Sequence, residues 1–439
     1  MSGRRLDGAR PRAEVPERVT ELSADWVLPV DGPPIAGGRV RWENGEIVEV
    51  GPGRAERHYA DAAIVPGFVN AHSHLEYAVY AGFGDGASFG TWIRTHVERK
   101  RRLDSDDMVA IARCGVADSF RTGITTTADY SFSGAGAIAA AELGLRATVY
   151  LEVFADDPED ARRRFEEKRA LVEETALVTI GVSPHAPYTC SLETYRWCLS
   201  LGIPVGTHLA ESAAENEWLE HGTGALQDLP VLVPPTGKRA VTTLEPVLGP
   251  ELLCAHCVEV SADEIALLAE RNVPVAHCPR SNALLGCGVA PVTAMRAAGI
   301  VVGLGTDSPA STPSVDVFEE MRAAIYAARA LERRPEALLA TDALHLATGE
   351  AARALRIDGR VGTLTPGKRA DLAVVSLAGS PYHPVEDPAA AVVFGGSPER
   401  VLETIVDGQT RYLREEKEQW QEVRSTASAA RRRMLAPKP

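Results

Sequence analysis

The chain has 439 residues, of which 45% are hydrophobic and 24% are charged, a mixture typical of a folded globular protein. Its 46 basic and 60 acidic residues give a formal net charge of −14. An acidic surface repels phosphate backbones, so we expect neither a nucleic-acid partner nor an anionic membrane. The length suits one large barrel with an accessory domain and excludes a disulfide-stapled miniprotein.

The start of the chain carries no recognisable targeting signal. Arginines occur within residues 1–17, but no apolar run follows them, which argues against a secretory signal peptide. No uninterrupted apolar stretch of about 18 residues occurs, so no membrane span is predicted. The seven cysteines are too few for a disulfide scaffold and indicate reduced thiols. We therefore expect a cytoplasmic protein with a flexible tail at residues 1–17.

Short alternating segments at both ends of the chain predict one small β domain. Near the start, two such segments flank Asn44-Gly45, a dipeptide typical of a two-residue β-hairpin turn. Short alternating segments of the same kind occur again near the other end of the chain. We therefore assign residues 18–62 and 359–415 together to a small β-sandwich domain. Residues 416–439 are charged and are expected to form a C-terminal helix and tail on the surface.

Between these ends, apolar strand-like runs alternate with helical patterns. A capping box formed by Ser261 and Glu264 opens one of the helices. Eight strands with helical crossovers over residues 63–358 predict a distorted parallel (β/α)8 TIM barrel as the catalytic domain of an α/β protein. The eight runs are residues 63–70, 124–129, 148–154, 178–183, 204–207, 252–255, 273–276 and 301–305.

Polar side chains follow many of these runs, at the end of the barrel where such folds place their chemistry. His72 and His74 follow the first run, and residues two apart in a strand face the same side. Such a pair alone would fit a core or surface role equally well. The later runs add five more polar residues, so that the whole set favours a functional site. These residues are His185, His208, Glu211, His256 and Asp307.

Imidazoles combined with a carboxylate form a ligand set that suits Zn²⁺ or Fe²⁺. We therefore predict one divalent metal ion, zinc with iron as the alternative, held by four residues: His72, His74, His208 and Asp307. Glu211 is expected to lie beside the ion, where it is free to move protons. His256 is expected to hydrogen-bond the water that completes the metal's shell.

These motifs resemble those of the amidohydrolase superfamily, and the resemblance covers residues 20–415. It is carried by Pro66-Gly-Phe-Val-Asn-Ala-His-Ser-His, His208-Leu-Ala-Glu-Ser, Cys254-Ala-His-Cys-Val, His277-Cys-Pro-Arg-Ser-Asn and Gly303-Leu-Gly-Thr-Asp-Ser. The sequence is similar to the deaminase and chlorohydrolase branch, which the resemblance associates with a single zinc ion. No lysine stands at the end of the fourth run, where binuclear relatives carry a carboxylated one.

The resemblance also implies a role for each residue of the site. Glu211 would protonate the ring nitrogen beside the attacked carbon, and Asp307 would accept the proton of the attacking water. His256 would position that water. These three are the candidate catalytic residues. The candidate substrate-binding residues are His185, Trp92 and Glu76.

The resemblance implies hydrolytic deamination of an adenine-type purine nucleoside, and aminofutalosine is the substrate that the motifs favour. Adenosylhomocysteine deaminases carry a ribose-binding glutamate where this chain has Arg101, nine residues after Trp92. They also carry an arginine for the substrate carboxylate, and the ungapped equivalent here is Leu151. The stretch Tyr150-Leu-Glu-Val-Phe154 is more similar to aminofutalosine deaminases.

Other functions stay open at this point. The resemblance also covers methylthioadenosine/adenosylhomocysteine deaminases, guanine deaminases and triazine-type chlorohydrolases, which use the same water on other substrates. A non-catalytic scaffold of this superfamily would be expected to lack metal ligands, and every expected ligand is present. The expected partner is a small-molecule substrate. The sequence leaves both a monomer and a homo-oligomer open.

Several residues near the motifs receive structural interpretations. Trp92 is expected in a long loop after the first strand, and Asn282 is expected to stabilise a loop after the seventh. Glu215 and Glu217 are expected at the exposed start of a helix.

Four cysteines invite a second metal hypothesis, since Cys254 and Cys257 form a C-x-x-C pair and Cys278 and Cys287 follow. A structural zinc site prefers two tight pairs, and the second pair is nine residues apart. Core packing is therefore favoured, with a redox role as the alternative.

Overall fold

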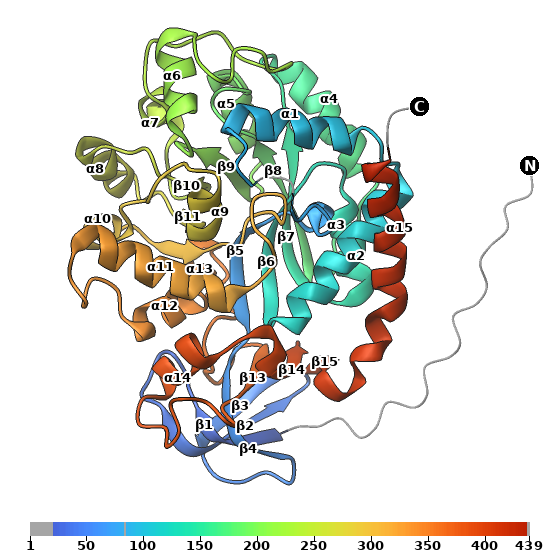
Figure 1. The fold of residues 1–439 in the computed structure, drawn as a ribbon, viewed down its shortest axis with the longest axis vertical. Helices are drawn as coiled ribbons and strands as arrows, with labels where there is room; N and C mark the ends of the chain where they lie inside the picture. Colours follow the sequence, from blue (N-terminus) through green and yellow to red (C-terminus); the bar gives the residue numbers. More distant parts are fainter. Residues whose placement is uncertain (1–20, 83–84, 437–439) are drawn as a thin grey trace, which may run out of the picture.

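The computed structural model of the chain describes residues 21–82 and 85–436, which form two β-sheets with helices around the larger one (Figure 1). The tail predicted at residues 1–17 lies outside the described residues. The larger sheet has eight strands and the smaller sheet has seven.

Eight parallel strands follow one another in chain order through the larger sheet. A bridge between Ser73 and Asp307 and a 2.9 Å hydrogen bond from Asp307 N to His72 O join the last strand to the first, so the sheet closes into a barrel. The strands are β5 (Phe68–Ser73), β6 (Ile124–Ser131), β7 (Arg146–Val153), β8 (Val178–Pro184), β9 (Val205–Leu209), β10 (Leu252–His256), β11 (Val275–His277) and β12 (Val302–Leu304).

Helices connect these strands around the outside of the barrel (Figure 1). Two of them, α2 and α8, begin with reciprocal capping boxes, and that of α8 is the predicted pair of Ser261 and Glu264. The helices are α1 (Phe89–Lys100), α2 (Ser105–Arg121), α3 (Ala135–Leu143), α4 (Pro158–Arg169), α5 (Leu192–Ser200), α6 (Ala213–His221), α7 (Ala240–Leu244), α8 (Ala262–Glu270), α9 (Pro279–Leu284), α10 (Val292–Ala297), α11 (Val317–Glu332), α12 (Ala340–Leu346) and α13 (Gly349–Ala354).

Strands from the N-terminal part of the chain and from the region before α15 (Gln421–Leu435) meet in the smaller sheet, whose strand order is β15-β14-β13-β4-β1-β2-β3. The predicted hairpin joins β2 to β3 through Asn44 and Gly45, whose φ values of 52° and 77° suit a two-residue turn. The strands are β1 (Glu21–Val27), β2 (Ile35–Glu43), β3 (Glu46–Pro52), β4 (His58–Pro66), β13 (Leu372–Ser376), β14 (Val401–Val406) and β15 (Gln409–Leu413).

The first apolar run of the sequence belongs to both sheets. It breaks at Gly67, so that β4 ends in the smaller sheet and β5 begins the barrel. A Cβ at Gly67 would lie 2.2 Å from the Thr125 side chain, which explains why the chain can pass there only without a side chain. The predicted distorted barrel with a small β-sandwich domain from both chain ends is confirmed. The exact domain boundaries stay predictions.

A buried ion pair links the barrel to the smaller sheet. Arg146, the first residue of β7, donates from Nε and Nη2 to the two carboxylate oxygens of Asp371, just before β13, at 2.8 and 3.0 Å. Its Nη2 also lies 3.3 Å from Asp407 Oδ1. Because Arg146 and Asp371 are both buried, this bidentate contact fixes the two sheets against each other.

The segment after the smaller sheet returns to the barrel wall as α15 (Gln421–Leu435), which runs beside α2 (Figure 1). Ala427, Ala430 and Met434 are its buried residues. A further helix, α14 (Pro388–Gly395), lies between β13 and β14 in the chain.

Candidate metal and catalytic site

Three histidines and one aspartate bring their polar atoms together at the carboxyl ends of the barrel strands. His72 and His74 come from the end of β5, His208 from β9, and Asp307 from the residues after β12. Asp307 Oδ1 lies 3.4 Å from His72 Nε2 and 3.5 Å from His74 Nε2. His208 Nε2 lies 3.5 Å from His74 Nε2, and all four residues are buried.

This spacing fits a single divalent ion. Tetrahedral nitrogen and oxygen ligands at about 2.1 Å from a metal lie about 3.4 Å from one another. The outer ring nitrogens are already occupied, since Nδ1 of His74 and of His208 donate to the carbonyl oxygens of Tyr130 and His185, each at 2.8 Å. The Nε2 atoms therefore face the centre as acceptors, as in many metal sites.

The protonation state of the histidines also fits metal binding. Burial lowers the pKa of His74 to about 3 and that of His208 to about 4. Both rings are therefore neutral at pH 7, which is the form that binds a metal ion.

Two serines orient the carboxylate of Asp307. Ser281 Oγ and Ser311 Oγ donate to Oδ2 at 2.5 and 3.1 Å, which leaves Oδ1 toward the histidines. The backbone of Asp307 has a φ of 56°, a conformation that non-glycine residues adopt at a cost. The hydrogen bond of its backbone to β5 compensates for part of that cost.

Glu211 lies next to this group, two residues beyond the end of β9. Its Oε1 is 3.9 Å from His256 Nε2, and its side chain is buried. Burial, together with the nearby Asp307 and Glu215, raises the pKa of Glu211 well above its usual range. This shift favours the protonated form of the carboxyl group, which is the form that can donate a proton.

Glu215 corrects one expectation from the sequence. Glu217 is exposed, as was expected for the start of α6. Glu215 instead is fully buried, and its carboxylate accepts hydrogen bonds from the backbone N of Ala210 (3.1 Å) and of Glu211 (2.8 Å). The loop after β9 needs acceptors for these two N–H groups, and Glu215 provides them. Burial raises the pKa of Glu215 to about 7.

His256, at the end of β10, is oriented by the residue that was expected only to stabilise a loop. Asn282 Nδ2 donates to His256 Nδ1 at 3.1 Å. This contact places the imidazole proton on Nε2, which faces Glu211. Asn282 is therefore a positioning residue for His256.

Two predicted substrate contacts lie at the rim of the group. His185 stacks against Phe154 with ring centroids 4.4 Å apart and lies 4.8 Å from the His208 ring. Trp92 is not in a loop, as was expected, but in the first turn of α1, and its Nε1 donates to Ala310 O at 2.9 Å. This bond ties α1 to the segment after β12. Substrate contact by either residue stays a prediction.

The third predicted substrate contact, Glu76, is fully buried. Its carboxylate accepts hydrogen bonds from the Ser131 hydroxyl, from Ser133 N (3.1 Å) and from Ser133 Oγ (3.0 Å). The carboxylate oxygens of Glu76 are thus already occupied by donors of the turn after β6. The structure therefore favours a structural role for Glu76 over the predicted contact with substrate.

The sequence patterns missed a charged group beside the histidines. Glu152 lies near the end of β7, where the charges of Lys100 in α1 and Lys168 in α4 act on its carboxylate, and Lys168 Nζ donates to its backbone oxygen. Glu152, His185 and His208 have polar atoms that all lie within 4.8 Å of one another. The position of Glu152 at a strand end was a signal in the sequence. The two lysines lie on separate helices, and no sequence pattern indicated that they would lie near Glu152.

The cysteines take no part in a metal site within the described residues. All seven are free and buried, and the clusters of potential ligand atoms contain only histidine and carboxylate side chains. Burial raises the pKa of Cys254 and of Cys257 above the usual thiol range. These findings support core packing.

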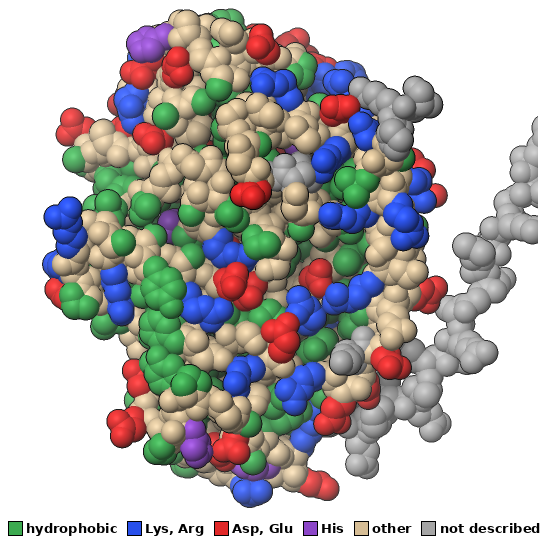
Figure 2. Space-filling model, viewed as in Figure 1, with side chains coloured by type: hydrophobic (Ala, Val, Ile, Leu, Met, Phe, Trp, Pro, Cys, Tyr) green, Lys and Arg blue, Asp and Glu red, His purple; other side chains and the backbone are tan. Residues whose placement is uncertain are grey.

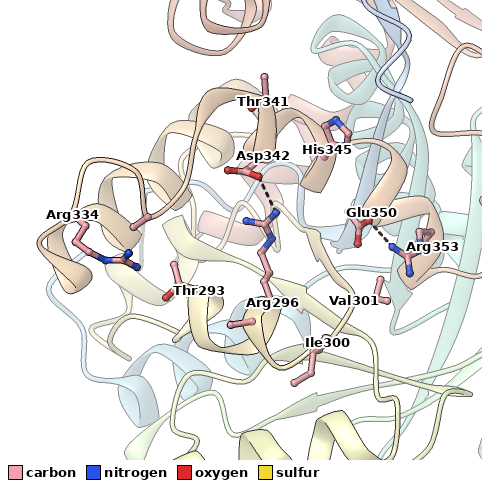
Figure 3. Close-up of a pocket in the computed structure, with 13 residues that line it drawn as sticks. Thr293, Arg296, Ile300, Val301, Arg334, Thr341, Asp342, His345, Glu350 and Arg353 are labelled. Atoms are coloured by element: carbon pink, nitrogen blue, oxygen red, sulfur yellow. Dashed lines mark hydrogen bonds and ion pairs between the residues drawn. The ribbon is translucent and has the colours of Figure 1, made fainter. Parts of the chain in front are cut away.

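A pocket of about 580 Å³ opens elsewhere on the barrel (Figure 3). It is lined partly by residues that precede β12, so it lies at the amino end of that strand, whereas the site lies at the carboxyl ends. Two ion pairs lie within its lining, with Arg296 2.9 Å from Asp342 and Arg353 2.7 Å from Glu350. We therefore assign this pocket no part in the catalytic site.

Comparisons with known proteins agree with this geometry. A sequence profile described as "Amidohydrolase family" matches residues 63–411. A 5-methylthioadenosine/S-adenosylhomocysteine deaminase of Symbiobacterium thermophilum is 33% identical over 88% of this chain and 92% of its own length. A 5′-deoxyadenosine deaminase of Methanothermobacter thermautotrophicus is 32% identical over 79% of this chain and 81% of its own.

A solved structure is also similar. The crystal structure of an adenosine deaminase from Xanthomonas campestris with bound zinc superposes with a TM-score of 0.85 and 26% sequence identity. The match covers 94% of this chain and 98% of the other.

Proposed function

Because this chain belongs to the amidohydrolase family, we propose that it is a metal-dependent aminohydrolase that deaminates an adenine-type purine nucleoside and releases ammonia. The observation that carries this proposal is the position of the buried Glu211, which lies next to His256 and beside a group of four potential metal ligands. The ligands that we propose are His72, His74, His208 and Asp307. The names of the relatives support the same class of reaction.

A zinc or iron ion held by these ligands would lower the pKa of a water molecule and supply a hydroxide nucleophile at neutral pH. The side chains of this chain supply the proton transfers. Glu211 donates its proton to the ring nitrogen N1 while C6 is attacked, and Asp307 accepts the proton of the attacking water. His256 Nε2–H orients that water. Asp307 then passes the proton it accepted to the C6 amine, which leaves as ammonia. The remaining hydroxyl proton at C6 returns to Glu211 as the carbonyl of the inosine-type product forms.

Within this class, the substrate that we propose is an aminofutalosine-like nucleoside. Arg101 and Leu151 stand where adenosylhomocysteine deaminases carry substrate-binding glutamate and arginine residues, which argues against adenosylhomocysteine. The second candidates are methylthioadenosine and 5′-deoxyadenosine, because the chain is 32–33% identical to enzymes named for such substrates.

A substrate panel tests the proposal. Purified protein is incubated with aminofutalosine, methylthioadenosine, 5′-deoxyadenosine, adenosylhomocysteine, guanine and a chlorotriazine, and kcat/KM is measured from ammonia or chloride release. We expect one ammonia per adenine nucleoside consumed, with aminofutalosine highest. A higher kcat/KM for methylthioadenosine would replace aminofutalosine as the preferred substrate but would leave the proposed class, deamination of an adenine nucleoside, unchanged. A much higher value for guanine or the chlorotriazine would contradict the nucleoside class.

A further inference from the structure

A carboxylate beside the catalytic group has no partner within the described part of the chain. Glu152, near the end of β7, is 2% exposed. Across residues 21–82 and 85–436, no hydrogen bond or ion pair reaches either of its carboxylate oxygens. A buried carboxylate normally has hydrogen-bond donors, because an unsatisfied one costs free energy. Glu152 therefore faces a place where a ligand can provide them.

The spacing around Glu152 fits a bridging hydroxyl group. Its carboxylate lies within 4.8 Å of a ring nitrogen of His185, yet no direct hydrogen bond joins the two side chains. His208 belongs to the same cluster, but its Nδ1 is paired with His185 O and its Nε2 faces the proposed metal ligands, so His185 is the ring left to share a ligand with Glu152. Two hydrogen bonds of about 2.8 Å that share one oxygen span such a gap. The Nδ1 atom of His185 is paired with Thr189 Oγ1 at 2.9 Å, so its Nε2 is the nitrogen left for a ligand.

Two lysines favour the ionised form of this carboxylate. Lys168 Nζ donates to the backbone oxygen of Glu152 at 2.5 Å. Lys100 Nζ lies 3.4 Å from the centroid of the Phe132 ring and 3.4 Å from Tyr77 Oη. Burial raises the pKa of Glu152 to about 7, and the charges of the two lysines oppose this rise. The two carboxylate oxygens have no donor in the described chain, so a ligand that donates hydrogen bonds suits them best.

In a purine nucleoside with an exocyclic amine, the donors are that amine and the sugar hydroxyls. The amine is on the carbon attacked near Glu211 and His256, which come from the ends of β9 and β10. Glu152 and His185 come from β7 and β8, on the other side of His208 in the barrel. The exocyclic amine is therefore directed away from Glu152, and the sugar hydroxyls are the remaining hydrogen-bond donors that can bind at the ends of β7 and β8.

We propose that Glu152, together with His185, binds the vicinal 2′- and 3′-hydroxyl groups of the nucleoside sugar. The inference rests on the proposed nucleoside deamination and adds a sugar subsite to it. Two hydroxyls donate to the two carboxylate oxygens, and His185 Nε2 contacts one of them. Lys100 and Lys168 act through Glu152, by holding its charge.

The test compares ligands with and without the diol. Turnover is measured with methylthioadenosine and its 2′,3′-dideoxy analogue. Binding is measured by calorimetry with the matching inosine-type products, which cannot be deaminated. Hydrogen bonds to a charged group are each worth about 10- to 100-fold, so we expect wild-type kcat/KM and affinity to favour the diol by at least 10-fold. Glu152→Met, of similar volume without an acceptor, should bring both ratios close to one.

Glu264→Gln is the matched control. Glu264 is also buried, but it caps α8 and pairs with Arg239 at 3.1 Å, so this variant should keep the diol preference.

Three results would overturn the proposal. They are an equal affinity of the wild-type protein for the two inosine-type ligands, an equal loss on both substrates in Glu152→Met, and the loss of a metal equivalent in that variant, which would make Glu152 a ligand. If neither nucleoside is deaminated while the diol still binds more tightly, the sugar subsite is supported and the proposed reaction is wrong.

Discussion

Two carboxyl groups of the site, Glu211 and Asp307, are in environments that favour opposite protonation states. Burial and two neighbouring carboxylates raise the pKa of Glu211 well above its usual range. Burial alone would also raise the pKa of Asp307, but its contact with His72 holds that pKa well below the usual range. The opposite directions of these shifts favour Glu211 as the proton donor and Asp307 as the proton acceptor, the division that acid–base hydrolysis uses.

The proposed role of Glu211 predicts the behaviour of Glu211→Gln. The amide keeps the shape of the side chain but cannot donate an acid proton, so turnover should fall by about 10²- to 10⁴-fold. Metal content should stay at the wild-type value, because Glu211 is not among the proposed ligands. Single-turnover ammonia release and elemental analysis check the two parts separately. Near wild-type turnover would rule out the proton-donor role.

Glu215 allows a prediction about pH. Only the protonated form of Glu211 donates, so kcat/KM should fall as the pH rises through the pKa of Glu211. The charge of Glu215 contributes to the raised pKa of Glu211. Glu215→Gln removes that charge and makes ionisation of Glu211 easier. The alkaline limb of the pH profile should therefore move to lower pH. A limb that does not move, or moves to higher pH, would show that another group controls it.

At the level of elements, the residues that follow the strands take unusual backbone conformations. Ala210, His256 and Asp307 have φ values of 50°, 77° and 56°. Such conformations are costly for residues with a Cβ and collect at functional sites. Here they occur where β9, β10 and β12 end, and they turn the chain so that neighbouring side chains face the barrel mouth.

The same elements show what could be predicted from the sequence. Strands buried on both faces appear as apolar runs, so all eight barrel strands were found, and the polar residues after them were recognised by position. Trp92 was placed in a loop, because α1 lies in a long connection whose helix is recognisable only from its packing. The burial of Glu215 depends on backbone donors in a neighbouring loop, and a local pattern does not contain that information.

The ion pair between β7 and the segment before β13 predicts a large effect on stability. Arg146→Met should lower the free energy of unfolding by about 3–5 kcal/mol, because Asp371 would stay buried without its guanidinium partner. Urea unfolding measures this difference. Arg162→Met is the control, since the pair of Arg162 with Glu166 is exposed and its removal should leave the midpoint unchanged. Equal midpoints for both variants would contradict a structural role of the Arg146 pair.

On the scale of the whole molecule, the face drawn in Figure 2 carries no large patch of only basic or only acidic side chains. Basic and acidic side chains are interspersed there (Figure 2), and the chain carries a net charge of −14. Within the described residues, none of the helices has the length and apolar character that a membrane crossing requires. The absence of nucleic-acid and membrane partners stays a prediction, as does the oligomeric state.

The joining of both terminal regions in one sheet was also predictable, because both regions consist of short alternating segments typical of β-strands. What could not be predicted is how the charged residues of separate helices meet. Lys100 and Lys168 belong to α1 and α4, and only the closed barrel brings them to Glu152. The sugar subsite was therefore absent from the sequence-based predictions.

The most direct test of the central claim is a zinc titration of metal-free protein, followed by ammonia release from aminofutalosine and methylthioadenosine. We predict that the metal-free protein releases no ammonia. Activity should then rise linearly with added zinc and level off at one equivalent per chain, because one group of four ligands is proposed. Deamination without metal, a plateau at two equivalents, or no ammonia from either nucleoside at full zinc occupancy would contradict the account.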